Sequence, residues 1–222
     1  MMGIKEAIVQ LNFFSNLDED RIEKLIAISS FKKYSSGLLL HYEKSQSKNL
    51  LFLVNGLAKA YKIDKHDNEI FLYYVYSNQM LSEVSTLKAD KFISYSNIVF
   101  VEESEVLSID YEAFKREFLD KGLLCLELAD EIIRQSKQLQ DLVNREFIFD
   151  SVSKVAKMLH SDVEMFNKLK RYDVSLMLHI QPSTLSRVLS RLKRQNIIDI
   201  DHGEVIIVDA KALENIYEGL VL

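Results

Sequence analysis

The chain has 222 residues, of which 48% are hydrophobic and 27% charged. These are ordinary globular values, so they exclude a disordered or collagen-like chain, and the length predicts two modest domains. No apolar run approaches the roughly 18 residues of a membrane helix, and residues 1–16 lack the apolar stretch of an export signal. We therefore expect a soluble, cytoplasmic protein with no membrane partner. The single cysteine, Cys125, excludes an internal disulfide, a cysteine-rich zinc site and a cysteine-ligated iron–sulfur cluster.

The formal net charge of −5 is unevenly distributed. Seven basic residues and one acidic residue lie between Lys168 and Arg194, so this window carries +6 and the other 195 residues carry −11. A run of positive charge is typical of a nucleic-acid-binding surface, and the alternative is a solvated helix face. The motifs around the run distinguish the two.

The first half of the chain is predicted to be mostly β. After one amphipathic helix over residues 17–28, short apolar runs alternate with polar turns from Tyr34 onward. The run Glu69–Tyr76 is apolar on both alternating faces and predicts a strand covered on both sides, and residues 95–109 predict a further strand pair. These segments predict a small roll or barrel.

The second half is predicted to be helical, with helices over 111–119, 124–149 and 151–167. In the longest, six residues recur at steps of three or four, which is the spacing of a coiled-coil seam. They are Leu124, Leu128, Ile132, Gln135, Leu139 and Leu142. Such a seam predicts a partner helix, and we favour self-dimerisation over packing against the chain's own β domain.

The only proline, Pro182, begins a predicted helix over 182–195, because a proline fits the first helical position. A shorter helix over 171–178 and a tight turn precede it, and two short strands hinged on Gly203 follow it. Helix, turn, helix and hairpin together predict a winged helix-turn-helix.

The second helix of this motif carries slim hydroxyl side chains and arginines opposite its apolar stripe. These suit a helix that lies in the major groove, because small residues allow close approach and an arginine can donate two bonds to guanine. We predict Lys193 to contact phosphate. The predicted DNA-binding residues are Gln181, Ser183, Thr184, Ser186, Arg187, Arg191 and Lys193.

Nearly the whole chain resembles the Crp/Fnr-type bacterial transcription regulators. The matching motifs are FFSNLDEDRIEKL, KYSSG with HYEKS, LLFLVNGLAKAY, LSIDYEAFKREF and PSTLSRVLSRLKRQNII. The resemblance implies an α+β fold in which a cyclic-nucleotide-binding-like β-roll (1–120), a long dimerisation helix (121–149) and a winged helix-turn-helix (150–222) follow one another. It also implies that Ser186 and Arg187 read base edges, whereas Ser183 stands where many members have an acidic reader.

The resemblance further implies a homodimer on a pseudo-palindromic operator that acts on transcription by RNA polymerase. Cyclic-nucleotide-binding members use Gly-Glu-Leu followed, about ten residues later, by arginine and a hydroxyl residue. Here the matching stretch is Ser82-Glu83-Val84, and no arginine occurs between Arg21 and Arg116, although Lys88 or Lys91 could supply a point charge. We therefore do not expect cyclic AMP or GMP to be the effector.

The remaining effector expectation is an apolar, tyrosine-rich pocket in the roll, formed by Tyr74, Tyr76, Met80, Glu83 and Tyr95. The PSTLSR motif resembles the nitric-oxide-responsive (Dnr/HcpR-like) branch linked to nitrosative stress, which implies haem as a candidate cofactor. Its candidate axial ligands are Met80 and His160. The alternatives are that the rings fill the core, that Met80 is core filler and that His160 is a surface residue. No zinc site is expected.

An enzyme is not expected, because the sequence contains no GxGxxG, Walker, GxSxG or HExxH motif. The hypothesis is a homodimeric DNA-binding regulator whose β-roll senses a small, non-nucleotide signal. The alternative is a regulatory binding protein of the same fold that has a non-haem ligand or none and acts through protein partners.

Overall fold

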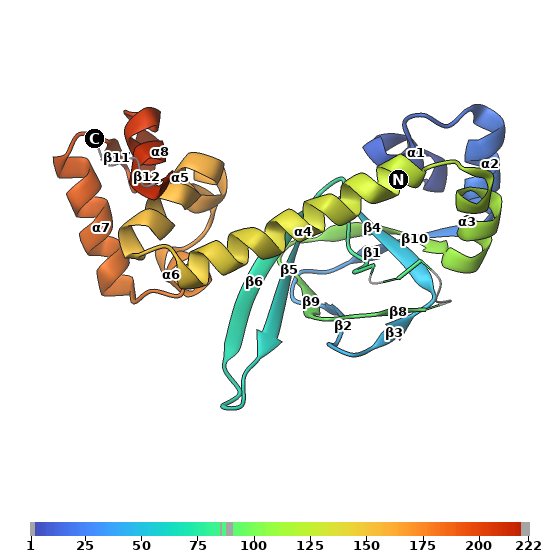
Figure 1. The fold of residues 1–222 in the computed structure, drawn as a ribbon, viewed down its shortest axis with the longest axis horizontal. Coiled ribbons are helices and arrows are strands. Elements are labelled where there is room, and N and C mark those ends of the chain that lie inside the picture. The colour runs from blue at the N-terminus through green and yellow to red at the C-terminus, as the bar shows by residue number, and fades with distance from the viewer. Residues whose placement is uncertain (1–2, 85, 88–90, 219–222) are drawn as a thin grey trace. The chain divides into compact units, whose positions relative to one another are not determined.

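The computed structural model describes residues 3–84, 86–87 and 91–218. The chain forms two compact units, residues 1–138 and 139–222, and each is described by itself. The boundary falls within helix α4 (Cys125–Phe147). Figure 1 shows the elements of both units.

The first unit is a β-roll of antiparallel strands, as the sequence predicts. One sheet has the order β1-β10-β4-β7, a second has the order β2-β9-β5-β6, and β3 pairs with β8. Figure 1 shows the β5–β6 hairpin extending beyond the other strands of this unit. The strands are β1 (Ser29–Tyr34), β2 (Leu39–His41), β3 (Gln46–Ser47), β4 (Asn49–Asn55), β5 (Leu57–Ile63), β6 (Glu69–Tyr76), β7 (Gln79–Met80), β8 (Phe92–Ile93), β9 (Asn97–Phe100) and β10 (Ser104–Asp110).

Strand β6 has the bounds that its sequence pattern predicts. Phe71, Tyr74 and Val75 are buried and its other aromatic residues are half-buried, so both faces are covered. The predicted strand pair over 95–109 is present as β9 and β10.

Short helices pack at one end of the roll. Asp18 and Asp110 cap α2 and α3 by accepting hydrogen bonds from backbone N–H groups of the first turn, which the first turn of a helix cannot satisfy itself. The helices are α1 (Ile4–Gln10), η1 (Asn12–Phe14), α2 (Glu19–Ala27), α3 (Tyr111–Glu117) and η2 (Leu119–Lys121). The sequence reasoning did not predict α1.

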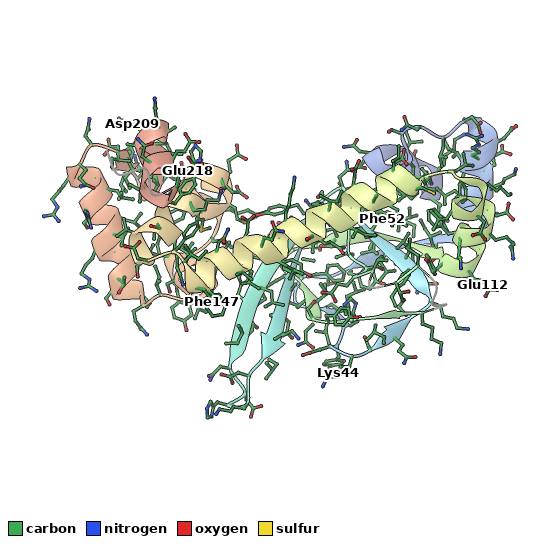
Figure 2. All side chains as sticks on the ribbon, viewed as in Figure 1. Lys44, Phe52, Glu112, Phe147, Asp209 and Glu218 are labelled. Atoms are coloured by element: carbon green, nitrogen blue, oxygen red, sulfur yellow. The ribbon has the colours of Figure 1, made fainter. Side chains whose placement is uncertain are left out.

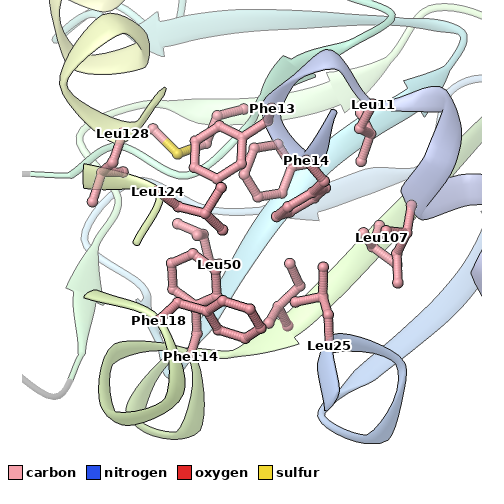
Figure 3. Packing of buried hydrophobic residues seen from close by; sticks show 14 of the residues in the cluster. Leu11, Phe13, Phe14, Leu25, Leu50, Leu107, Phe114, Phe118, Leu124 and Leu128 are labelled. Carbon is pink, nitrogen blue, oxygen red and sulfur yellow. The ribbon is translucent and has the colours of Figure 1, made fainter. Parts of the chain in front are cut away.

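One core cluster of this unit lies between the helices, the first sheet and the start of α4. A second cluster lies within the roll around Leu53, Ile98 and Phe100. Phenylalanines from η1, β4 and α3 meet in the first of these clusters, with ring centroids of Phe13 and Phe52 4.8 Å apart. Figure 3 shows Leu124 and Leu128 entering the same cluster. The first part of α4 is therefore fixed to the roll by apolar packing.

Gly56 makes the tight connection between β4 and β5. Its φ of +106° lies where residues with a Cβ are strained, and a Cβ there would lie 2.8 Å from the Cα of Ser104. Gly56→Ala is expected to destabilise the first unit by about 2–4 kcal/mol, because backbone strain and overpacking add. Thermal unfolding followed by circular dichroism measures this. The control is Gly37→Ala, which also has a positive φ but has no atom within 4 Å of the added methyl group; equal losses would contradict the role of the Ser104 contact.

The second unit contains the end of α4, four more helices and a two-stranded hairpin. Asp150 caps α5, and the Asp162 backbone interrupts that helix with a φ of −159°. The predicted helix-turn-helix and wing are present with nearly the predicted bounds. The elements are α5 (Ser151–Lys168), α6 (Arg171–Met177), α7 (Pro182–Arg194), β11 (Ile198–Asp201), β12 (Glu204–Ile207) and α8 (Ala210–Glu218), the last of which the sequence reasoning missed.

The hairpin turn of this unit is His202–Gly203. Both residues have positive φ, which matches the right-handed twist of a two-residue hairpin. The core of the unit is formed by α5, α6, α7, the hairpin and α8 around Phe166 and Leu213, which are fully buried.

Candidate functional site

Helix α7 has one buried and one exposed face. Leu185, Val188, Leu189 and Leu192 are all buried and fix the helix in the second unit. The opposite face is exposed to solvent, since burying its polar side chains without hydrogen-bond partners would cost free energy. Ser183, Ser186, Arg187, Ser190, Arg191 and Arg194 are exposed, and Thr184 is half-buried.

Five of the predicted DNA-binding residues lie at the start of α7. Gln181 is the N-cap position but makes no side-chain cap bond, and Pro182 occupies the first turn. The Ser186 hydroxyl donates to the Pro182 carbonyl at 3.1 Å. Arg187 donates from Nη2 to Thr184 Oγ1 at 3.1 Å, which holds the guanidinium along the exposed face. The predicted residues Gln181, Ser183, Thr184, Ser186 and Arg187 thus lie at the start of α7, over its cap position and first two turns, and all but the half-buried Thr184 are exposed.

Arg171 and Lys193, both in the +6 window, bond to other segments of the second unit. Arg171 donates to the carbonyls of Phe166 and Gly203 and lies 4.4 Å over the Phe166 ring, so it holds the hairpin turn against α5. Burial lowers the pKa of Arg171. Lys193 pairs with Asp199 at 2.7 Å and donates to the Ile200 carbonyl, which ties α7 to β11. A count of charges along the sequence could not reveal these bonds to other segments of the unit.

In the first unit, Glu83 is the centre of a polar cluster. Its carboxylate accepts from the Tyr73 hydroxyl at 2.9 Å, the Ser96 hydroxyl at 3.0 Å and the backbone N–H of Tyr95 at 2.5 Å and of Ser96 at 3.3 Å. Burial, together with the Glu83 charge, raises the pKa of Tyr73, so this tyrosine remains a donor at neutral pH. Ser96 is a functional candidate that the sequence did not reveal, whereas Tyr73 belongs to the tyrosine-rich strand that the sequence pattern predicted.

His41 lies near the same cluster. Its Nε2 is buried and has no hydrogen-bond partner among the described residues. Burial lowers the pKa of His41, against the opposing charge of Glu83, so the imidazole is neutral at neutral pH. The sequence contained no signal for this, because the residue stands alone in a short strand.

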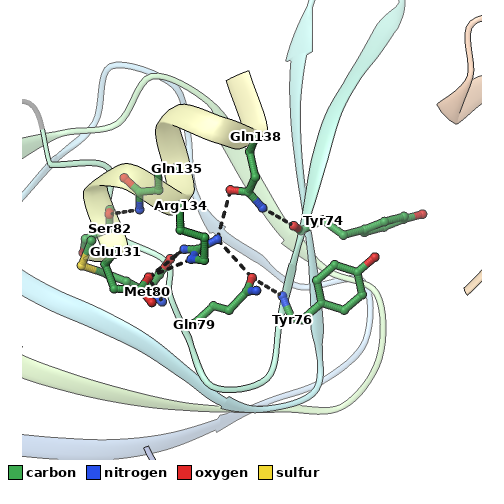
Figure 4. A network of polar contacts seen from close by, with 9 residues as sticks. All are labelled: Tyr74, Tyr76, Gln79, Met80, Ser82, Glu131, Arg134, Gln135 and Gln138. Atoms are coloured by element: carbon green, nitrogen blue, oxygen red, sulfur yellow. Dashed lines mark hydrogen bonds and ion pairs between the residues drawn. The ribbon is translucent and has the colours of Figure 1, made fainter. Parts of the chain in front are cut away.

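The other residues predicted for an effector pocket lie elsewhere in the unit. Tyr74 and Tyr76 use backbone groups to bond Gln138 and Gln79, as Figure 4 shows. Met80 is 1% exposed and belongs to the core cluster, while the Tyr95 side chain is half exposed. Of the five predicted residues, Glu83 bonds Tyr95, and the Tyr74 and Tyr76 rings meet edge to face with 6.4 Å between their centroids.

Arg134 of α4 organises the contacts in Figure 4. It pairs with Glu131 at 2.8 Å and donates to the Met80 carbonyl at 3.2 Å and to Gln79 and Gln138. Gln135 donates to the Ser82 carbonyl at 2.9 Å. The first part of α4 is thus bonded to β6, β7 and the segment that follows β7.

Four of the six residues of the predicted dimer seam contact the chain's own roll. Leu124 precedes α4 and is 5% exposed, Leu128 is 3% exposed, and Ile132 packs against the same core. With Gln135 bonded to Ser82, these four residues face the chain's own roll, which was the alternative considered. Leu139 is exposed and Leu142 is half-buried in the second unit. Periodicity locates a stripe on a helix but does not say what covers it.

The two candidate haem ligands have other contacts. The Met80 side chain is packed in the core, and His160 Nδ1 shares a hydrogen bond of 2.7 Å with the Tyr217 hydroxyl. Within the described parts of the chain, no group of three or more His, Cys, Asp or Glu side chains is placed to hold a metal ion. Among the same residues, no helix is long and apolar enough to span a membrane.

Two family models match the chain. A cyclic nucleotide-binding domain matches residues 31–121, and a Crp-like helix-turn-helix domain matches residues 152–216. The chain belongs to the Crp/Fnr family. As a Crp/Fnr protein it is a DNA-binding transcription regulator with a sensor domain, and members of the family are not enzymes.

Relatives of this Crp/Fnr protein match over nearly their full length. The "Cyclic AMP receptor protein" of Thermus thermophilus is 20% identical over 211 residues, which are 93% of this chain and 97% of the relative. A CooA variant from Carboxydothermus hydrogenoformans has a TM-score of 0.72 at 16% identity, covering 93% of this chain and 95% of that one. FixK2 from Bradyrhizobium japonicum has a TM-score of 0.68 at 15% identity, and the match covers 85% of this chain and 97% of FixK2. At these identities the two structures show a shared fold.

Proposed function

We propose that the protein is a homodimer that binds a pseudo-palindromic operator and acts on transcription by RNA polymerase. The observation that carries this is the start of α7, where the exposed residues Ser183, Ser186 and Arg187 lie on the first two turns of a helix anchored by four buried side chains. A major-groove helix reads bases with its N-terminal residues, and two such helices in a symmetric dimer reach half-sites roughly 34 Å apart.

Selection of bound duplexes from a random pool tests the operator directly. We expect the purified full chain to enrich one inverted-repeat sequence and to bind random duplex more weakly, with an affinity that falls steeply as salt rises. A chain that enriches no sequence, with or without its signal, would contradict the proposal. Binding that is insensitive to salt would instead favour a regulator that acts through protein partners.

For the dimer contact we propose a face of α4 different from the predicted seam. Its seven residues recur at steps of three and four, all are exposed, and the apolar ones at the ends, Leu126 and Phe147, are 80% and 84% exposed. Figure 2 labels Phe147 at the end of α4. A heptad stripe that its own chain leaves uncovered suits a second copy of the same helix. The face comprises Leu126, Ala129, Ile133, Ser136, Gln140, Val143 and Phe147.

We propose that the signal is a small molecule other than a cyclic nucleotide. A cyclic phosphate needs a cation and free backbone donors, but the Tyr95 and Ser96 N–H groups are bonded to Glu83, which is itself an anion. Lys91 donates to Gln46, and Lys88 lies outside the described residues. The described residues of the roll, which leave out 85 and 88–90, therefore do not fit a cyclic phosphate.

Titration with cyclic AMP and cyclic GMP tests whether the roll binds a cyclic nucleotide. Calorimetry with either nucleotide is expected to show no saturable heat of binding up to about 1 mM. A dissociation constant of about 1 mM corresponds to a binding free energy of only about 4 kcal/mol. Operator affinity should not change when either nucleotide is added. The same protein sample must bind duplex DNA, as a control for its integrity. Saturation of binding in the micromolar range would contradict the proposal that Glu83 already accepts the N–H bonds of Tyr95 and Ser96 that a cyclic phosphate would need.

Haem that responds to nitric oxide is one specific candidate for the signal. An absorption spectrum after haem addition, with and without the gas, distinguishes it: a Soret band that shifts with nitric oxide supports haem, and a featureless spectrum supports a different small ligand. The variants Met80→Leu and His160→Ala then show whether either residue ligates the iron.

A further inference from the structure

The turn between α6 and α7 contains an unusual backbone position. His179 has a φ of +51°, in the left-handed region where glycine is free of strain and most residues with a Cβ are not. A turn that only had to reverse the chain would be better served by glycine. At this position the imidazole makes a hydrogen bond that can offset the strain.

The imidazole contacts the last turn of α4. His179 Nδ1 lies 2.8 Å from Glu146 Oε2, and since a carboxylate can only accept, Nδ1 is the nitrogen that carries the proton. The other nitrogen, Nε2, is buried with no hydrogen-bond partner among the described residues. The ring is thus oriented by one bond, to Glu146.

Glu146 lies where three segments of the second unit meet. Besides His179 from the turn, it receives Arg145 Nε of α4 at 3.1 Å and faces Lys154 Nζ of α5 at 3.9 Å. Burial raises the pKa of Glu146, but the hydrogen bond and charge of His179, together with Arg145 and Lys154, outweigh it and hold the pKa below its ordinary value. The carboxylate is therefore ionised and its bond to His179 is charge-assisted.

We propose that His179 is a positioning residue for DNA recognition: through Glu146 it fixes the turn before α7 against the end of α4, and so sets the direction of α7 relative to α4. Helix α7 begins at Pro182, three residues after His179, so little chain separates the contact from the helix. For its effect on DNA, this inference rests on the proposed function. In a dimer joined through α4, the direction of α7 determines the half-site spacing that both helices can occupy together.

The variants separate this contact from the backbone strain. His179→Gly removes the imidazole and relieves the strain, while His202→Gly relieves the same kind of strain (φ +49°) at a side chain that is 93% exposed and pairs with its neighbour Asp201. His179→Asn is the conservative variant. Asparagine tolerates the left-handed region, and its amide nitrogen is as many bonds from the backbone as Nδ1, so it can donate to Glu146.

The measurement uses the selected operator, the same operator with its spacer changed by one base pair, and random duplex, all with full-length protein. His179→Gly is expected to lower operator affinity roughly tenfold, to leave random-duplex affinity unchanged and to reduce the preference for the native spacer, because an unfixed helix must be ordered on binding. His179→Asn and His202→Gly are expected to keep the native preference. In a double-mutant cycle, Glu146→Gln should add little to the loss caused by His179→Gly.

The results distinguish failure of the inference from failure of the proposed function. If no operator is selected, the proposed function fails. If an operator is bound but His179→Gly and His202→Gly have the same spacer preference, or if His179→Gly weakens random and specific duplex equally, the positioning role is refuted.

Discussion

Replacing Arg187 by alanine is expected to lower affinity for the specific operator by about 1–3 kcal/mol, the range in which a bidentate arginine–guanine contact discriminates between bases. The fold should persist, because Arg187 is exposed and loses one internal bond, to Thr184. Affinity for random duplex should change little. Fluorescence anisotropy with the operator and a random duplex, at one fixed salt concentration, measures the ratio of specific to random affinity.

Arg194→Ala is the matched control for Arg187→Ala. It removes the same charge from the same helix, but at the last turn, away from the end that reads bases. We expect it to weaken specific and random duplex alike through lost phosphate attraction. Arg187 is excluded as a base reader if its ratio of specific to random affinity equals that of the control.

Most of the local structure was predictable from the sequence because each signal is local. Pro182 marks the start of α7, and the apolar stripe 185, 188, 189 and 192 identifies its buried face. The turn at His202–Gly203 follows from the residue types alone. Such features depend on neighbours within a few residues, and the structure confirms them with shifts of one or two residues at the ends.

What the sequence could not predict depends on residues that are distant in the chain. The carboxylate of Glu83 meets donors that are 10 to 13 residues away, and Glu146 meets His179 33 residues later. Charge counting likewise assigned Arg171 to the DNA-binding window, although its guanidinium bonds the hairpin turn at Gly203. Residue type gives a side chain's chemistry, but only the fold gives its partner.

The periodicity of α4 likewise does not identify which partner covers each stripe of the helix. Two stripes run along it at coiled-coil spacing, and the sequence reasoning selected the one that begins with Leu124 and Leu128. That stripe is the more apolar of the two at its start, and it is the one that the roll covers. A helix that packs on its own domain and also associates with a second copy needs two such stripes. The second stripe becomes the candidate interface only once the structure shows that the first is covered by the roll.

The two stripes predict opposite results for charged substitutions. The double variant Ile133→Asp and Val143→Asp, at two half-exposed positions of the proposed dimer face, is expected to produce folded monomers. Leu128→Asp instead places a charge in the core of the roll and is expected to unfold the first unit, since an unpaired buried charge costs several kcal/mol. Sedimentation with thermal unfolding separates loss of association from loss of fold.

Loss of the dimer is expected to have the largest effect on DNA binding of any change considered. A monomer presents one recognition helix, so the second half-site no longer binds as an intramolecular event, and avidity of about 10²- to 10⁴-fold is lost. Asp130→Lys alters charge at an exposed α4 position outside the proposed face and should leave both mass and operator affinity unchanged. If the Ile133/Val143 variant still sediments as a dimer, association uses another surface, and the spacing of the half-sites must then be set by that surface rather than by α4.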